Sequence, residues 1–209
     1  MKNFLYTLFF SLLTFPLASH ASGNLESTDL VGVTFWVISV ALVASTAFFF
    51  FESLRVKGKF RTSLVVSGLV TLVAAIHYFY MRDVWVTTGT SPTVFRYIDW
   101  VITVPLLMIE FYLILAACTK VSLGVFWRLT VGTLVMLIAG YLGEAGFIDS
   151  TIGFVVGMAG WAYILYEIFA GEAASVNASQ ATPAVQSAYN SMKWIVTIGW
   201  AIYPLGYFF

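Results

Sequence analysis

The sequence predicts an all-α membrane protein, a bundle of six transmembrane helices. Of its 209 residues, 60% are hydrophobic and 10% are charged, whereas soluble domains carry about 25% charged residues. A water-soluble core of this size could not bury so much apolar surface. Ten basic and ten acidic residues give a net charge of zero, which argues against nucleic-acid-binding and disordered proteins. A single cysteine, Cys118, excludes an internal disulfide and a multi-cysteine metal site.

The first 21 residues are predicted to be a signal peptide. Lys2 precedes an uncharged apolar run over residues 4–17, and residues 18–21 (ASHA) form a small-residue pattern that a signal peptidase cleaves. The alternative is a short uncleaved membrane helix, although a spanning helix needs about 20 apolar residues. Residues 22–209 then form the transmembrane domain.

Six apolar stretches follow, and each is long enough to cross the roughly 30 Å hydrocarbon core of a bilayer as a helix. They are residues 30–51, 63–81, 95–119, 126–142, 152–170 and 184–209. Glycine, proline and charged residues separate them. Ser91-Pro92 and Thr182-Pro183 each predict a helix N-cap followed by a proline in the first turn.

The positions of lysine and arginine orient the chain, because cytoplasmic flanks carry the excess of both. Seven basic residues fall on one side: Arg55, Lys57, Lys59, Arg61, Lys120, Arg128 and Lys193. Arg82 and Arg96 fall on the other side. The predicted topology therefore places the N-terminus outside the cell. The sixth span runs to residue 209 without a polar tail, so we expect further polypeptide after it.

The third span contains charged residues whose burial in a membrane is costly, which marks them as functional candidates. Asp99 and Glu110 are eleven residues apart, about three full turns, so they face the same way, and Thr103 shares that face. Arg96 can pair with Asp99 across one turn. The two carboxyls are separated by roughly 16 Å along the helix axis, too far to share a proton, so we interpret them as stations on a proton path. The alternative is that both are buried for packing or helix association.

Other polar residues within the spans have two interpretations each. His77 lies in the middle of the second span and could hydrogen-bond a carboxyl of the third, tuning its proton affinity, or be a satisfied core histidine. Glu144 and Glu167 lie near span ends and are expected at the membrane interface. Pro105 and Pro204 each remove a backbone hydrogen bond and permit local bends.

Aromatic residues and glycines suggest a ligand slot and close helix packing. A slot for a flat apolar ligand could be lined by Trp100, Trp161, Trp200 and Tyr203, although such residues also serve packing alone. Small residues let helices approach closely, and we expect this within the molecule. The glycines concerned are Gly140, Gly143, Gly153, Gly157 and Gly160.

Four motifs resemble helices three and six of the proteorhodopsins, the bacterial branch of the microbial rhodopsins. They are residues 96–100 (RYIDW), 103–107 (TVPLL), 110–112 (EFY) and 199–204 (GWAIYP). The resemblance implies a seven-helix bundle that holds all-trans retinal and, driven by light, moves protons from the cytoplasm to the outside. Such a protein is an ion transporter and not an enzyme. The resemblance also implies the bacterial inner membrane and assembly into pentamers or hexamers.

The same resemblance assigns roles to individual residues. Asp99 would be the Schiff-base counterion and primary proton acceptor, and Glu110 the internal proton donor. His77 would bond to Asp99 and tune it, Arg96 would lie on the exit side, and Thr103 would complete the pump triplet. The residues implied to contact retinal are Trp100, Leu107, Trp161, Trp200, Tyr203 and Pro204. Leucine at position 107 resembles the green-absorbing members.

The resemblance further implies a seventh helix that carries the retinal-binding lysine. That helix does not occur within residues 1–209, and the lysines of the six spans lie at their ends. We therefore expect the sequence to be part of the chain of a proton pump. The alternatives are a photosensory receptor that signals through a partner and, if the chain is complete, a chromophore-free six-helix transporter.

Overall fold

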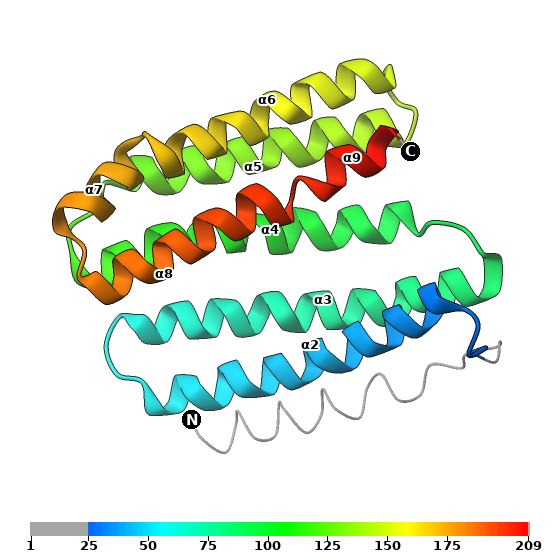
Figure 1. Cartoon of the computed structure of the whole chain (residues 1–209), viewed down its shortest axis with the longest axis horizontal. Helices are drawn as coiled ribbons and strands as arrows, with labels where there is room; N and C mark the ends of the chain where they lie inside the picture. The colour runs from blue at the N-terminus through cyan, green and yellow to red at the C-terminus, as the bar shows by residue number, and fades with distance from the viewer. Residues whose placement is uncertain (1–24, 209) are drawn as a thin grey trace.

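Helices joined by short loops make up residues 25–208, the part of the chain that this computed structural model describes (Figure 1). In chain order they are α2 (Leu30–Arg55), α3 (Phe60–Thr88), α4 (Thr93–Cys118), α5 (Leu123–Glu144), α6 (Ser150–Phe169), α7 (Glu172–Gln180), α8 (Pro183–Trp194), the π-helix η2 (Ile195–Gly199) and α9 (Ile202–Phe208). The predicted signal peptide, residues 1–21, lies outside the described residues.

One of the two predicted proline-containing helix starts is confirmed. Thr182 lies at the N-cap of α8 and its hydroxyl accepts a backbone N–H from the first turn, with Pro183 following as predicted. The prediction for Ser91 was wrong. Pro92 itself lies at the cap position of α4, and no side-chain hydrogen bond closes that helix start.

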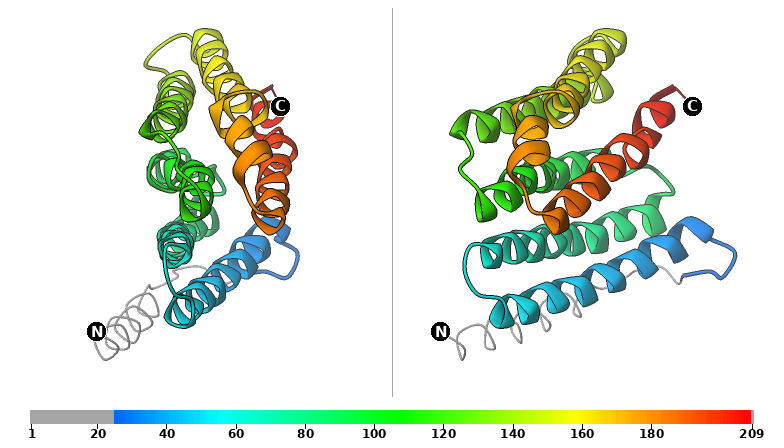
Figure 2. Two further views of the ribbon diagram at one scale, coloured as in Figure 1. Left: turned by 90° about the vertical axis from the view of Figure 1, so that its left-hand side faces the viewer. Right: turned by 60° about the vertical axis from the view of Figure 1, so that its left-hand side comes forward.

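The central helix of the bundle is α4. It contacts α3, α5, α7 and α8, whereas α2 packs on α3 and α6 packs on α5. The views in Figure 2 show α3, α4 and α5 as one row, with α6 to α9 running alongside α4 and α5. Eight buried residues lie on α4, including Asp99 and Glu110. The candidate carboxyls are therefore carried by the helix with the most neighbours.

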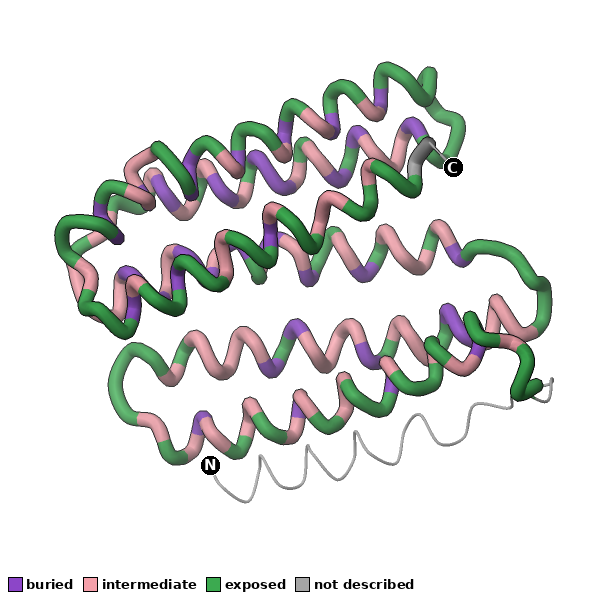
Figure 3. Tube along the Cα trace, viewed as in Figure 1, coloured by how far each residue is buried: buried purple, intermediate pink, exposed green. Residues whose placement is uncertain are grey.

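Within residues 25–208, five helical segments are long and apolar enough to cross a membrane. They are α2, α3, α4, α5 and the stretch Ser150–Gln180 that comprises α6 and α7. Exposed residues recur along the full length of these helices (Figure 3), among them Val37 (60% exposed), Val131 (52%) and Val155 (58%). Apolar surface of this extent suits hydrocarbon better than water. These segments match the first five predicted spans.

The sixth predicted span, residues 184–209, is helical but interrupted. Helix α8 passes into the π-helix η2, and a turn at Trp200 and Ala201 precedes α9. Pro204, in the first turn of α9, has no N–H to donate to the carbonyl of Trp200, four residues earlier, and the interruption lies in the residues just before it. Pro105 lies inside α4 without ending it.

Arg82, expected on the outer flank of the second span, is buried within α3. The helix continues to Thr88, so Arg82 lies inside it and is only 9% exposed. Its guanidinium lies 4.7 Å from the centre of the Trp36 ring on α2 and donates to Asp83 at 2.7 Å. Stacking on Trp36 and pairing with Asp83 therefore take the place of the water that we expected around Arg82 at the membrane surface.

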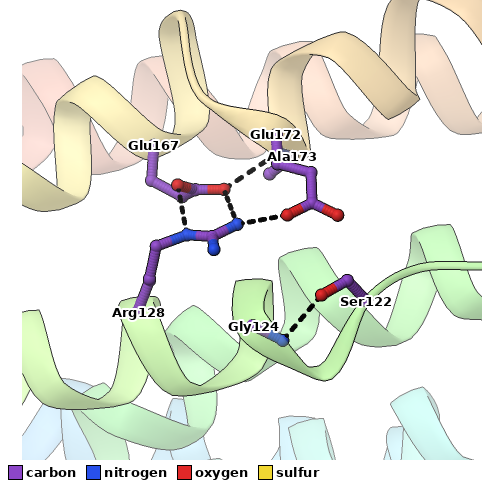
Figure 4. A network of polar contacts seen from close by, with 6 residues as sticks. All are labelled: Ser122, Gly124, Arg128, Glu167, Glu172 and Ala173. Atoms are coloured by element: carbon purple, nitrogen blue, oxygen red, sulfur yellow. Dashed lines mark hydrogen bonds and ion pairs between the residues drawn. The ribbon is translucent and has the colours of Figure 1, made fainter.

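Glu167, expected near the membrane interface, lies near the end of α6 and is buried within the protein. It is 2% exposed because Arg128 reaches it from α5, donating to the two carboxylate oxygens at 2.8 and 3.2 Å (Figure 4). The same guanidinium donates to Glu172 at 2.6 Å, and the N–H of Ala173 donates to Glu167 at 3.0 Å. The ion pair therefore fastens the start of α7 to α5.

Glycine lets α5 and α6 pack closely, as expected. A Cβ on Gly153 or Gly160 would come within 2.7 or 2.8 Å of backbone atoms of α5. The expected packing within the molecule is therefore confirmed for these two glycines of α6. Gly140 of α5 faces the hydroxyl of Tyr97 on α4 instead.

Gly153→Ala and Gly160→Ala are each expected to lower the free energy of unfolding by about 1–3 kcal/mol, because the new methyl group forces two backbones apart. Gly206→Ala in α9 is the control, since a methyl group at this position would have no other atom within 4 Å. That variant should be neutral or slightly stabilising. Unfolding in detergent, followed by circular dichroism, measures all three. Equal losses in the three variants would contradict the packing argument.

Glu167→Gln is expected to lower the free energy of unfolding by about 1–3 kcal/mol, because it leaves Arg128 without its buried partner. Amide hydrogen exchange at Ala173 should become faster in this variant. Glu172→Gln is the matched control. That side chain is 39% exposed, so its loss should cost less than about 1 kcal/mol. A control as damaging as Glu167→Gln would show that burial is not what matters.

Candidate functional site

Helix α4 presents three polar side chains on one buried face. Asp99, Thr103 and Glu110 are 2%, 4% and 6% exposed, as the helical spacing predicts. The Thr103 hydroxyl donates to the backbone carbonyl of Asp99 at 2.9 Å. Its hydrogen bond therefore goes to the main chain and not to the Asp99 carboxylate. The shared face of the two carboxyls is therefore confirmed, and they occupy different depths along the helix.

Asp99 has fewer partners than the sequence suggested. His77 on α3 lies close, with 3.9 Å between its Nδ1 and the Asp99 Oδ1, but that distance is too long for a hydrogen bond. The His77 Nδ1 is instead 2.9 Å from the carbonyl of Val73, one turn earlier in its own helix. The Asp99 Oδ1 is buried without a hydrogen-bond partner among the described residues.

Arg96 was expected to pair with Asp99, and this was wrong. It forms an ion pair with Glu144 at the end of α5, and the hydroxyl of Thr93 donates to the same carboxylate oxygen at 3.2 Å. Side chains on a helix tilt toward its N-terminus, so Arg96 extends away from Asp99. Its guanidinium lies 5.3 Å from the centre of the Trp100 ring.

Glu110 is held by two serines that sequence reasoning missed. The hydroxyls of Ser63 and Ser67 on α3 donate to its two carboxylate oxygens, the second at 2.9 Å. The serines are four residues apart, so they lie one turn apart on a single helix face. The second and third spans are antiparallel, so the start of the second lies opposite the end of the third. Two serines four residues apart at that start are the signal that could have identified the partners of Glu110.

The predicted aromatic residues do not all meet. Trp100 and Tyr203 are in contact, with ring centres 4.9 Å apart, and both line a cleft of about 230 Å³ together with Arg96. Trp200 instead packs against the apolar core. The Nε1 of Trp161 is buried without a partner in the described chain. Two further predicted ligand contacts, Leu107 and Pro204, are exposed and half-buried respectively.

Comparison with known proteins identifies the family of the chain. Residues 29–209 match the family described as bacteriorhodopsin-like protein. A green-light absorbing proteorhodopsin from Gamma-proteobacterium EBAC31A08 is 55% identical over 198 residues, which are 95% of this chain and 79% of that relative. Sensory rhodopsin-2 from Natronomonas pharaonis is 30% identical over 182 residues, 84% of this chain and 73% of the relative.

Solved structures similar to this chain are also rhodopsins. The blue light-absorbing proteorhodopsin from Med12 is 54% identical, with a TM-score of 0.72 over 86% of this chain and 80% of its own. The rhodopsin of Exiguobacterium sibiricum is 33% identical, with a TM-score of 0.73 over 84% of this chain and 78% of its own. The chain therefore belongs to the bacteriorhodopsin-like protein family, as the motifs of its third and sixth spans predicted.

Proposed function

We propose that this chain forms the proton-conducting bundle of a light-driven outward proton pump that uses all-trans retinal. The observation that carries the proposal is the pair of buried carboxyls on one face of α4. Neither Asp99 nor Glu110 is bonded to a lysine or arginine side chain in the described chain. A carboxyl without a fixed cation is free to exchange protons, whereas a structural ion pair is not. The proteorhodopsins among the relatives support light as the energy source.

The site residues fit a flat apolar cofactor with one cationic end. Trp100 and Tyr203 offer aromatic faces, and the unpartnered oxygen of Asp99 offers a counter-charge. Retinal, when bound, would supply light absorption and an isomerisation that displaces a proton. Trp161, Trp200, Leu107 and Pro204 are proposed as further contacts from the family resemblance alone. The described lysines lie in loops or, for Lys193, against Phe169, so covalent attachment beside Asp99 needs a lysine at another position.

The side chains divide the proton path into an outer and an inner half. Asp99 accepts the proton in the outer half, and His77, 3.9 Å away, is the neighbour that tunes it. Glu110, roughly 16 Å further along α4, donates from the inner half. Arg96 lies on the exit side, where Glu144 holds it.

The bundle is proposed to lie in a bacterial inner membrane with its N-terminus outside. The loops α2–α3 and α4–α5 would then face the cytoplasm, because these loops and the adjoining helix ends carry five of the nine lysines and arginines of residues 25–208. The proton would enter at that end, near Glu110, and leave at the other. Assembly into a pentamer or hexamer is proposed from the family resemblance.

The whole proposal is tested by expressing the protein, with any polypeptide that its gene encodes after residue 209, in cells supplied with all-trans retinal. The membranes should become coloured, and illumination should acidify an unbuffered medium. Asp99→Asn should abolish the acidification, because the carboxyl that accepts the proton is gone. A proton carrier added to the wild type should also abolish it. Colourless membranes, or acidification that survives Asp99→Asn, would refute the proposal.

Glu110→Gln should slow the reprotonation step of the photocycle about 100-fold, since the amide cannot donate a proton. Flash spectroscopy of the pigment measures this step. Glu26→Gln, the same change at an exposed position before α2, is the matched control and should leave the rate unchanged. Unchanged kinetics in Glu110→Gln would favour a photosensory receptor, which needs no fast internal donor.

A further inference from the structure

One end of the bundle divides into a neutralised part and a basic part. Where α5, α6 and α7 meet, Arg128 is bonded to Glu167 and Glu172, and at the end of α2 Arg55 is bonded to Glu52. The α2–α3 and α4–α5 loops and the first turn of α3 differ, because their basic side chains have no carboxylate partner in the described chain. These side chains are Lys57, Lys59 and Lys120 in the loops and Arg61 in α3, here called the basic edge.

The two loops of the basic edge are held together. The Nζ of Lys59 donates to the carbonyl of Ala116 in the last turn of α4, at 3.2 Å. Lys120 follows two residues after that helix ends. Lys57 and Lys120 stay exposed. The α2–α3 and α4–α5 loops lie at the same end of the bundle (Figure 1), and Lys57 and Arg61 are each two residues from Lys59 in the sequence.

Exposed aromatic rings lie next to the basic edge. Phe60, the first residue of α3, is 40% exposed, and Phe51 in the last two turns of α2 is 44% exposed. Phe48, one turn earlier, is 59% exposed. Phenylalanine rings are wholly apolar, so at this level of a spanning helix they suit contact with lipid acyl chains. The surface therefore combines unpaired positive charge with an apolar flank.

We propose that the basic edge binds the headgroup of an anionic phospholipid. Clusters of lysine and arginine next to membrane-spanning helices attract anionic headgroups, and each cation raises the association several-fold. A phosphate at this position would meet the charge that no carboxylate of the described chain neutralises, while the acyl chains would lie along the exposed rings. A second copy presenting the same edge would bring like charges together, which disfavours it as the occupant.

The test uses the full chain in nanodiscs that contain phosphatidylcholine and a minor fraction of phosphatidylglycerol. Native mass spectrometry then counts the lipids that remain bound to the protein. The wild type should retain phosphatidylglycerol in preference to phosphatidylcholine, and Lys57→Gln with Arg61→Gln should reduce that preference about tenfold. Lys57→Arg with Arg61→Lys should keep it. Lys193→Gln is the matched control, because this cation lies in the last turn of α8, 4.5 Å from the Phe169 ring, and is not part of the basic edge; the change should leave the preference unchanged.

Three outcomes would overturn the proposal. The first is an unchanged preference in the doubly neutralised variant that retains wild-type helix content by circular dichroism. The second is displacement by inorganic phosphate beyond the effect of sodium chloride at equal ionic strength, which would identify free phosphate as the ligand. The third is a change in the number of copies per particle with no change in bound lipid, which would identify the surface as an interface between copies. None of these measurements requires a pigment, so the lipid surface can fail or hold independently of the proposed pump.

Discussion

The apolar interior of the bundle offers little water to the carboxyls of α4, so each must find polar partners on a neighbouring helix. Glu110 finds two, because Ser63 and Ser67 donate to both of its oxygens. Among residues 25–208 Asp99 finds none for its Oδ1, since His77 is bonded within its own helix. The two carboxyls on one helix face therefore have unequal surroundings. In the proposed pump, an acceptor that lacks a fixed partner and a donor that is held in place would have the asymmetry that one-way transfer needs.

The need for polar partners on neighbouring helices also explains why Arg96 pairs with Glu144 and not with Asp99. An ion pair between Arg96 and Asp99 would hold the carboxylate in its charged form and make it a structural element. The tilt of helical side chains toward the N-terminus carries the guanidinium to Glu144 on α5 instead. The positive charge then stays near the N-terminal end of α4, the end that the proposed pump would turn outward. Pairing across helices therefore leaves Asp99 available for chemistry.

Periodicity within one helix was predictable from the sequence, and contacts between helices were not. The spacing of Asp99, Thr103 and Glu110 placed them on one face, and the structure confirms it. The first five spans were also located, because hydrophobic length identifies a membrane helix without knowledge of its neighbours. The partners of Arg96 and Glu110 depend on which helix ends meet, and Glu167 is buried only because Arg128 reaches it from α5. Spacing along a chain carries no information on such pairs unless the helix order is considered with it.

Helix order also decides which charges remain for binding. Glu167 near the end of α6 and Glu172 at the start of α7 lie beside α5, so they neutralise Arg128 and not the basic edge. Among the described residues Lys59 bonds to a backbone carbonyl, and a carbonyl supplies a dipole where a phosphate would supply a full charge. Besides water and counterions, the protein's own carboxylates and anionic lipid headgroups are the groups that neutralise charge at the ends of a membrane bundle. Where the fold places no carboxylate beside a cation, anionic lipid headgroups are the partner that the membrane provides.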